Sequence, residues 1–279
     1  MIIVADSGST KTEWITERLS VTTKGINPVR DSYEEILSII NTELMPLLFS
    51  ESQQNADEVT EIHFYGAGCI EPFLQSVRRA IENTFTKAKV YVYSDLLGAV
   101  RALCGREEGI ACILGTGSNS CLCKDGQIIQ NISPLGYILG DEGSGAVLGR
   151  KMLAEMLKGE LKELWSSFSE EYQLEVADVI NKVYRQPQAN RFLASIVPFI
   201  KKNLHHITVK NLVVSEFTQF LKRNVIPYNR LDLPVNFVGG VANNFKEEIA
   251  NACKENGLKL GRIINRPAEE ILRFHLCVI

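Results

Sequence analysis

The chain has 279 residues, of which 45% are hydrophobic, and its formal net charge is −3. This length holds one large domain or two of ordinary size, with enough apolar residues for a buried core. The weak negative charge argues against a nucleic-acid partner, and no apolar stretch approaches the length of a membrane span. Because the N-terminus enters a strand directly, without a basic region and an apolar signal core, we expect a cytoplasmic protein.

The first hundred residues alternate between strand-like and helix-like runs. We expect strands at Ile2–Ala5, Glu13–Glu17, Leu19–Thr23, Glu61–Tyr65 and Val90–Tyr93, and helices at Tyr33–Leu48, Phe73–Phe85 and Leu96–Leu103. Three strands followed by alternating helices and strands indicate an α/β fold with a mixed sheet.

The order begins again at Ile110, after the charged turn Arg106–Gly109. We expect strands at Ala111–Leu114, Ser120–Lys124, Gln127–Asn131, Val235–Val238 and Leu260–Ile264, and helices at about Ser144–Lys158, Lys246–Asn256 and Ala268–Leu276. From Leu161 to about Val225 the pattern is almost entirely helical, with Pro187 and Pro198 as breakers or helix starts. The sequence therefore predicts two domains, 1–108 and 109–279. The second has a helical insertion at about 160–230, and the last helix can pack back toward the first.

Two turns rich in small residues follow apolar strands. The first is Asp6-Ser7-Gly8-Ser9-Thr10-Lys11-Thr12, and the second is Gly115-Thr116-Gly117-Ser118-Asn119. Small residues let backbone N–H groups approach a phosphate, and an Asp at a strand end can hold Mg²⁺ through water. Ser, Gly and Asp are also ordinary turn formers. The recurrence of the pattern favours two similar halves with a nucleotide between them.

At these residues the sequence resembles the actin-like superfamily of sugar kinases, Hsp70 and actin. More closely, it resembles the N-acetylglucosamine kinases and the BadF/BadG/BcrA/BcrD-type ATPases. The resemblance also rests on Ser94-Asp95, on Gly136-Tyr137-Ile138-Leu139-Gly140-Asp141-Glu142-Gly143-Ser144-Gly145 and on Phe237-Val238-Gly239-Gly240-Val241-Ala242-Asn243. These motifs occur in the family's order over most of the chain. The resemblance implies two ribonuclease H-like domains, each a mixed sheet flanked by helices, with a ligand cleft between them.

Asp95 follows the strand Val90–Tyr93 and opens a helix. Side chains at the carboxyl ends of strands project into the ligand crevice of open α/β sheets. A carboxylate there can orient a substrate hydroxyl and take its proton during phosphoryl transfer. The alternative is an ordinary helix cap by Ser94 or Asp95. In the kinases that the sequence resembles, this Asp is the catalytic base.

The resemblance also implies the remaining site residues. We expect the ATP phosphates at Ser7, Gly8, Ser9, Thr10, Lys11, Thr12, Gly115, Thr116 and Gly117, Mg²⁺ near Asp6, and adenosine at Gly239, Gly240 and Asn243. The sugar is expected at Asn27, Gly66, Ala67, Gly68, Asp95, Ser118, Asn119, Gly136, Asp141 and Glu142. Most of these have ordinary alternatives as turns, caps or strand–helix connections. The glycines of Gly140–Gly145 exceed what a cap needs, which favours close approach to a ligand. Tyr137 stands where the family often has Trp.

Other candidate sites have little support. The seven cysteines are scattered through apolar segments, which fits reduced, buried thiols. Cys121 and Cys123 share a strand face and are expected in the core, and no paired CxxC motif supports zinc. The adjacent His205 and His206 are interpreted as surface residues.

Together with these patterns, the resemblance implies an ATP- and Mg²⁺-dependent kinase that transfers phosphate to an alcohol group of an N-acetylhexosamine. N-acetylglucosamine phosphorylated at O6 is the first choice. An N-acetylmuramate kinase, a BadF-type ATPase coupled to a partner protein and a non-catalytic nucleotide-binding module are the alternatives. The BadF type needs thiolates for a bridged Fe–S cluster, whereas the cysteines here fall in strand and helix patterns. Retention of Asp6, Lys11 and Asp95 argues against a decayed site.

N-acetylmuramate differs from N-acetylglucosamine by a lactyl carboxylate, whose burial requires a cation or open solvent. Arg30 is the basic residue nearest the proposed sugar turn, but we favour a solvated charge for it. The sequence leaves open which amino sugar is bound and whether the protein forms a homodimer.

Overall fold

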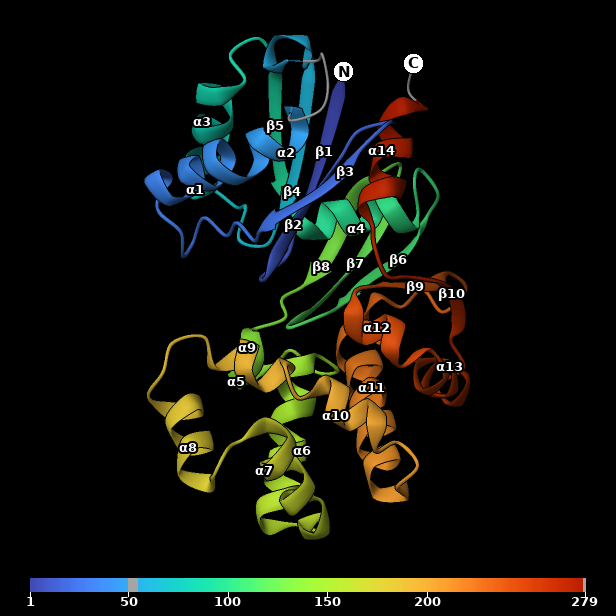
Figure 1. Cartoon of the computed structure of the whole chain (residues 1–279). Helices are drawn as coiled ribbons and strands as arrows, with labels where there is room; N and C mark the ends of the chain where they lie inside the picture. The colour runs from blue at the N-terminus through green and yellow to red at the C-terminus, as the bar shows by residue number, and fades with distance from the viewer. Residues whose placement is uncertain (50–54, 278–279) are drawn as a thin grey trace. The chain divides into compact units, whose positions relative to one another are not determined.

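The structure, a computed structural model, describes residues 1–49 and 55–277 and contains two compact units (Figure 1). Unit 1 is built from Met1–Glu107, Asp125–Gln127 and the chain from Arg266 onward. Unit 2 is built from Glu108–Lys124 and Ile128–Asn265. Each unit carries one five-stranded sheet flanked by helices, which confirms the predicted α/β class.

The sheet of unit 1 has the order β3-β2-β1-β4-β5. Its strands are β1 Ile2–Ser7, β2 Lys11–Ile15, β3 Ser20–Lys24, β4 Glu61–Gly66 and β5 Lys89–Ser94. The first three pair antiparallel, whereas β1, β4 and β5 are parallel, so the sheet is mixed as predicted. β2 ends before the predicted Glu17 because the Thr16 hydroxyl accepts the N–H of Leu19 at 3.0 Å and forms a turn.

Helices cover both faces of this sheet. They are α1 Tyr33–Ile39, α2 Met45–Phe49, α3 Leu74–Thr84, α4 Asp95–Leu103 and α14 Ala268–Leu276. Along β4, Ile62 and Phe64 lie in the core with α1 and α3, whereas His63 and Tyr65 point to the opposite face, where α4 and α14 pack. The single helix predicted at Tyr33–Leu48 is instead interrupted by a π-helical segment at Ile40–Leu44.

The sheet of unit 2 has the order β10-β9-β6-β7-β8. Its strands are β6 Gly109–Leu114, β7 Ser118–Lys124, β8 Gln127–Ile132, β9 Pro234–Val238 and β10 Lys259–Ile264. β6 pairs antiparallel with β7 and parallel with β9, and β9 is parallel to β10. Cys121 and Cys123 are fully buried, as predicted. Cys277 is exposed, so the expectation of buried thiols is wrong for this residue.

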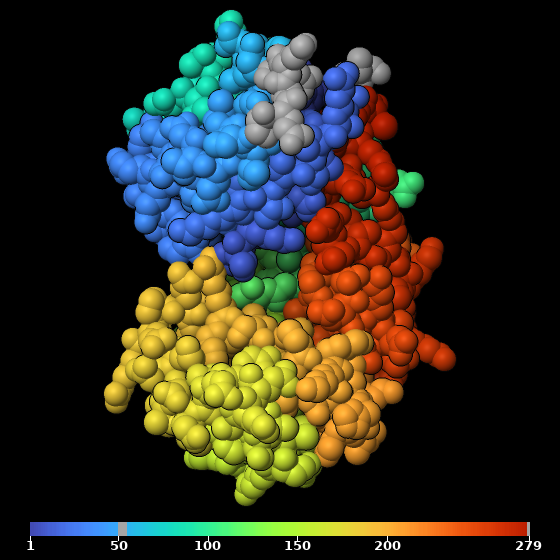
Figure 2. Space-filling view, viewed as in Figure 1, coloured from blue at the N-terminus to red at the C-terminus, as the bar shows by residue number. Residues whose placement is uncertain are grey.

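The helices of unit 2 include the predicted insertion, which forms much of the yellow and orange surface of this unit in the view of Figure 2. They are α5 Gly136–Leu139, α6 Gly145–Lys158, α7 Trp165–Tyr172, α8 Val176–Tyr184, α9 Ala189–Ala194, α10 Val197–Lys202, α11 Ile207–Asn224, α12 Gly240–Asn244 and α13 Lys246–Glu255. Pro198 lies in the first turn of α10, where its missing N–H is harmless. The short helices α5 and α12 were not predicted. In residues 1–49 and 55–277, no helix is both long and apolar enough to cross a membrane.

A polar aromatic cluster anchors α14 to the sheet of unit 1. The Tyr65 hydroxyl and His275 Nε2 are 2.7 Å apart, and the His275 ring stacks on His63 with 3.6 Å between ring centroids. Arg101 of α4 donates to the same Tyr65 hydroxyl and lies over the rings of Tyr93 and Phe274. Burial, followed by the positive field of His63 and Arg101, lowers the pKa of His275 to about 3. The imidazole is therefore neutral wherever α14 is docked at ordinary pH.

We predict that acidification destabilises unit 1 through His275. The pKa of His275 is near 6.5 in the unfolded chain and about 3 in the folded chain. Below pH 6.5 the unfolded chain therefore binds a proton that the folded chain does not bind, so this residue lowers the stability as pH decreases. Between pH 7 and pH 5 the loss is about 1–2 kcal/mol. Because the raised pKa values of Asp6 and Asp141 act in the opposite direction over this range, the loss is measured as a difference between proteins. In urea unfolding, the change from pH 7 to pH 5 should be less favourable in the parent, by about 1–2 kcal/mol, than in His275→Gln, which keeps a partner for Tyr65. The exposed His205→Gln serves as control, and equal changes in all three proteins would contradict the assignment.

Candidate functional site

The three parallel strands of unit 1 end side by side. Ser7 of β1 lies opposite Gly66 of β4, which lies opposite Ser94 of β5. Asp95 begins α4 directly after β5, and the Ser94 hydroxyl caps this helix by accepting the N–H of Leu97. Because the carboxyl ends of parallel strands meet at one edge, Asp6 and Asp95 are brought to the same place.

A group of carboxylates is crowded at this edge. Asp6 is the direct cross-strand neighbour of Glu13, a buried residue of β2. Burial, followed by repulsion from Asp95 and Glu13, raises the pKa of Asp6 to about 7, while Lys11 acts in the opposite direction. Burial also raises the pKa of Asp95, against the hydrogen bond that its Oδ1 accepts from the N–H of Leu96 at 2.8 Å. The edge therefore has an excess of negative charge that a cation would relieve.

The donor set at this edge suits Mg²⁺ better than a softer metal. Carboxylate oxygens are the ligands that Mg²⁺ prefers, and it keeps several of its waters, so it needs few direct protein ligands. The described residues contain no cluster of three or more His, Cys, Asp or Glu side chains arranged around a metal position. These carboxylates therefore fit a cation held largely through water, and Asp6 is the most central of them.

The turn after β1 is held from inside by two hydroxyls. The Ser7 and Thr12 hydroxyls are 2.7 Å apart and buried, and Ser7 both donates to the carbonyl of Ile26 and accepts its N–H. Thr12 donates to the carbonyl of Lys24. These two predicted phosphate ligands therefore have their hydroxyls engaged within the protein, and they fix the turn to the chain after β3.

The tip of the same turn is more accessible. Gly8, Thr10 and Lys11 are exposed and Ser9 is partly exposed. The Gly8 N–H donates to the carbonyl of Lys11 at 3.0 Å, which closes the turn, and the N–H of Gly25 donates to the carbonyl of Thr10. A side chain at Gly25 would collide with the Gly8 carbonyl, so this glycine is required for the contact.

Asn27 lies in a turn against Gly68. Its Oδ1 accepts the N–H of Val29 at 3.0 Å, and its own N–H donates to Asp31. Gly68 has a φ of 78°, and a Cβ there would meet the Asn27 side chain. Two segments far apart in sequence, both predicted to contact the sugar, are thus in direct contact within unit 1.

Arg30 is neither a free cation nor merely solvated. Its Nε donates to Asp31 Oδ1 at 2.7 Å and its Nη2 donates to Asp31 Oδ2 at 2.8 Å. The guanidinium lowers the pKa of Asp31 against the effect of burial. Because its charge is matched in a two-pronged pair, the expectation of a solvated charge is replaced by a structural ion pair.

The turn after β4 is compact. The Ala67 N–H donates to the carbonyl of Ser7 at 3.2 Å, which joins this turn to the end of β1. A Cβ at Gly66 would collide with the ring of Phe64 and approach Cys69, so a glycine is needed there for packing. The field of Asp95 reaches the buried Cys69 and adds to the effect of burial in raising the pKa of its thiol.

In unit 2, the second small-residue turn is attached to the start of α6. The Gly115 N–H donates to the carbonyl of Gly117, and the carbonyls of Gly115 and Thr116 accept the N–H groups of Gly145 and Ala146 at 2.8 and 3.1 Å. The Ser144 hydroxyl caps α6 by accepting the N–H of Val147. A Cβ at Gly115 would contact only one atom at 4.0 Å, so this side of the turn is open to a ligand.

Asp141 combines burial with a left-handed backbone conformation. It is 8% exposed and has a φ of 52°, a left-handed conformation that Asp and Asn tolerate better than most residues. Its carboxylate lies beside Gly117 and accepts the N–H of Ser118. Burial, followed by repulsion from Glu142, nevertheless raises its pKa to about 6.

The other predicted sugar residues of unit 2 have varied surroundings. Glu142 is held by Arg223 at 3.3 Å and by Asn224 at 3.1 Å, both from α11. Asn119 Oδ1 accepts the N–H of Ser120 and the side-chain amide of Asn131, so the oxygen of this amide is engaged within the protein. Ser118 is buried at the start of β7, whereas Gly136 is exposed with no atom near its Cβ position.

The extra glycines of Gly140–Gly145 have a reason in packing. A Cβ at Gly140 would collide with the carbonyl of Pro134, and one at Gly145 would press on Ala194 and Val197. Gly143 has a φ of 71°. The surrounding chain therefore gives each of these glycines a packing role, and close approach of a ligand to this segment stays a prediction.

The predicted adenosine turn contains two different glycines. Gly239 has a φ of 118°, and a Cβ there would collide with the Leu114 carbonyl at the end of β6. Gly240 begins α12, is exposed and has no atom within 4 Å of its Cβ position. Asn243 lies in α12, and its N–H donates to the carbonyl of Gly239. Only Gly240 thus leaves bare backbone open to a flat ligand.

Sequence reasoning missed Glu13 as part of the acidic edge. A signal was available, since Asp6 and Glu13 flank one hairpin turn and face each other in its antiparallel register. It also missed Arg223 and Asn224, for which the sequence offers no local signal, because they reach Glu142 from a helix about 80 residues away.

The chain is similar to known proteins over most of its length. A solved structure from Porphyromonas gingivalis, provisionally named an N-acetylglucosamine kinase, is 45% identical, with 99% of this chain and 98% of that chain covered and a TM-score of 0.94. The chain belongs to the N-acetylglucosamine kinase family. A curated family relative from Clostridium acetobutylicum, an N-acetylmuramic acid/N-acetylglucosamine kinase, is 26% identical over 266 residues, which is 87% of this chain and 86% of the relative.

A more distant solved structure shares the fold. A Chromobacterium violaceum protein, also provisionally named an N-acetylglucosamine kinase, has a TM-score of 0.72 at 16% identity, with 98% of each chain covered. No family model matches the chain. The 45% identity to the Porphyromonas relative over almost the whole chain establishes the membership in the N-acetylglucosamine kinase family.

We predict that Asp141 lowers the stability of unit 2 at neutral pH. Its folded pKa of about 6 exceeds the unfolded value near 3.8, so the folded chain holds a proton that the unfolded chain releases between these values. Stability therefore falls as pH rises through this window, by about 1–3 kcal/mol. Asp141→Asn can keep the bond from Ser118 and the left-handed backbone. Urea unfolding at pH 4 and pH 8 should show the variant matching the parent at pH 4 and exceeding it at pH 8.

Proposed function

We propose that this protein is an ATP-dependent kinase that phosphorylates an N-acetylhexosamine, with N-acetylglucosamine at O6 as the first choice. The observation that carries the proposal is the placement of Asp95 beside Asp6 where the parallel strands of unit 1 end. Membership in the N-acetylglucosamine kinase family and the names of the Porphyromonas and Clostridium relatives support the same conclusion.

In this proposal Asp95 orients the attacking hydroxyl and accepts its proton as the phosphoryl group is transferred. It is suited to this task because burial raises its pKa while the Leu96 N–H holds Oδ1 in place. The orientation of the sugar is assigned to Asn27 and the Gly66–Gly68 turn in unit 1, and to Asp141 in unit 2. Backbone donors in these turns and their small side chains suit a neutral acetamido group.

The phosphates of ATP are assigned to the exposed tip of the first turn and to the Gly115–Gly117 turn. In the first turn, Thr10 and Lys11 offer accessible donors, whereas Ser7 and Thr12 act by fixing its shape. The adenosine is assigned to Gly240. Asp6 would hold Mg²⁺ through water, and the bound metal would neutralise charge on the phosphates.

N-acetylmuramate is the second candidate substrate, since the curated relative is named for both sugars. A coupled assay of ADP release over a panel of amino sugars tests the proposal directly. We expect turnover with N-acetylglucosamine, and incorporation of phosphate at O6 by NMR of the product. Absence of turnover with every N-acetyl sugar, from a folded protein that binds ATP, would refute an amino-sugar kinase.

Replacing the proposed base should abolish transfer and spare nucleotide binding. Asp95→Asn keeps the size of the side chain but cannot take a proton, so kcat should fall by about two to four orders of magnitude. The Kd for ATP, measured by calorimetry, should stay within about twofold because Asp95 lies outside both small-residue turns. Asp57→Asn, an exposed change of the same kind, is the control. If Asp95→Asn turns over near the parent rate, Asp95 is not the base and serves only to begin α4.

Replacing Asp6 should affect ATP use with every acceptor. Asp6→Asn removes the central carboxylate of the acidic edge, so more Mg²⁺ should be needed for half-maximal ATP turnover, about tenfold more if one water-mediated contact is lost. Both sugar phosphorylation and slow ATP hydrolysis should shift together. An unchanged Mg²⁺ dependence would remove Asp6 from the metal site.

A further inference from the structure

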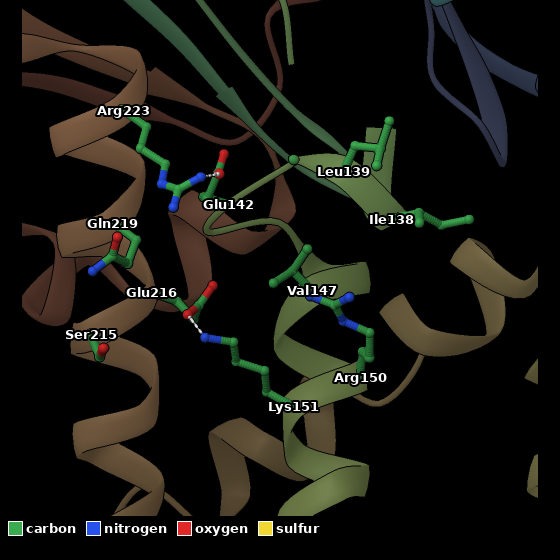
Figure 3. Close-up of a pocket in the computed structure, with 11 residues that line it drawn as sticks. Ile138, Leu139, Glu142, Val147, Arg150, Lys151, Ser215, Glu216, Gln219 and Arg223 are labelled. Carbon is green, nitrogen blue, oxygen red and sulfur yellow. Dashed lines mark hydrogen bonds and ion pairs between the residues drawn. The ribbon is translucent and has the colours of Figure 1, made fainter. Parts of the chain in front are cut away.

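Unit 2 contains a pocket whose charges the proposed chemistry does not use. It lies between α6 and α11 and is closed above by the segment from α5 to Glu142, with a volume of about 370 Å³ (Figure 3). That volume is much larger than one water molecule needs, so the pocket can hold a small organic group. Its lining is predominantly polar and comes from segments of unit 2 alone.

Five charged side chains line the pocket, three cationic and two anionic, which leaves one positive charge. Glu216 is almost fully buried and pairs with Lys151 across the pocket. Glu142 pairs with Arg223, as the dashed lines of Figure 3 show. Arg150 of α6 makes no hydrogen bond or ion pair with any residue in the described ranges 1–49 and 55–277, and it is the source of the surplus charge.

The pocket adjoins the turn that carries Asp141. Gly140 and Glu142 line it, and Asp141 stands between them in the chain. The Arg223–Glu142 pair is long, at 3.3 Å, and the Arg223 side chain is 65% exposed. Such exposed pairs contribute little to stability, so Arg223 can turn toward a ligand at small cost.

We propose that this pocket binds a carboxylate or phosphate group of a small molecule, with Arg150 as its main partner and Arg223 as the second. The inference rests on the proposed function only in its choice of probe, N-acetylmuramate. Arginine presents paired N–H groups that match the two oxygens of such an anion. A cationic ligand would face a net positive charge, and a neutral one would leave Arg150 without a partner.

This assignment also indicates which cationic side chain would pair with the carboxylate of an acidic amino sugar. In unit 1, Arg30 is already matched by Asp31, so it has no charge to offer a lactyl carboxylate. In unit 2, Arg150 has a free charge in a pocket that begins one residue from Asp141. The anion has two possible sources: a substituent on the sugar substrate or a separate small anion.

The test compares two sugars and one free anion on the whole chain. The ratio of kcat/KM for N-acetylmuramate to that for N-acetylglucosamine is measured in the parent and in Arg150→Gln. If the anion is a sugar substituent, the ratio should fall about tenfold in Arg150→Gln, because one charge-assisted contact is lost. In Arg150→Lys, which keeps the positive charge, the ratio should fall less than in Arg150→Gln. Arg185→Gln, the same change on an exposed residue outside the pocket, should leave it unchanged.

Binding of D-lactate and of inorganic phosphate, followed by calorimetry without sugar, covers the second source. An unchanged sugar ratio with anion binding that is lost in Arg150→Gln identifies a separate anion. An unchanged ratio together with anion binding that is absent, or that survives the loss of Arg150, overturns the proposal. If no sugar is phosphorylated by the parent, the proposed function fails while the anion titration still decides the role of the pocket.

Discussion

The feature on which the rest of unit 1 depends is the crowding of like charges at one edge of its sheet. Asp6, Glu13 and Asp95 are brought together by strand register and by the start of α4, and their mutual repulsion adds to the cost of burial. A chain selected for stability alone would avoid this arrangement, because each unit of raised pKa is free energy lost at neutral pH. The arrangement makes sense for a site whose charge is balanced by a ligand, and the surrounding structure holds it in place.

That support is unequal in the two units. In unit 1, the side chains of Ser7 and Thr12 fix the first turn, and Gly98 lets α4 pack on Tyr65, whose hydroxyl is held by Arg101. In unit 2, backbone groups do the same work, because the start of α6 donates two N–H groups to the Gly115–Gly117 turn. Both turns are therefore tied to neighbouring segments by hydrogen bonds, which lowers the entropy cost of ordering them when a ligand binds.

The amino-acid sequence predicts the parts of this protein that depend on local pattern. The apolar strands, the small-residue turns and Asp95 at a strand end all follow from short-range signals. The ten strands in the described part of the chain lie close to their expected positions. Contacts that depend on the folded path of the chain could not be predicted. The pairing of Arg30 with Asp31 depends on the exact path of a turn, and the hold of α11 on Glu142 depends on the packing of the insertion. The π-helical segment at Ile40–Leu44 and the short helices α5 and α12 also have no clear periodic signal.

The docking of α14 has a consequence for the order in which the chain can fold. The residues of unit 1 are not contiguous, since the chain leaves it after Glu107, passes through it again at Asp125–Gln127 and returns at Arg266. During synthesis, α4 can cover part of the sheet face that carries Tyr65, but the part under α14 stays uncovered until α14 has left the ribosome. Domains made early usually fold early, but this one is completed only when α14 docks. Until then its aromatic face is open to wrong partners, so the growing chain is most vulnerable to aggregation while unit 2 is being made.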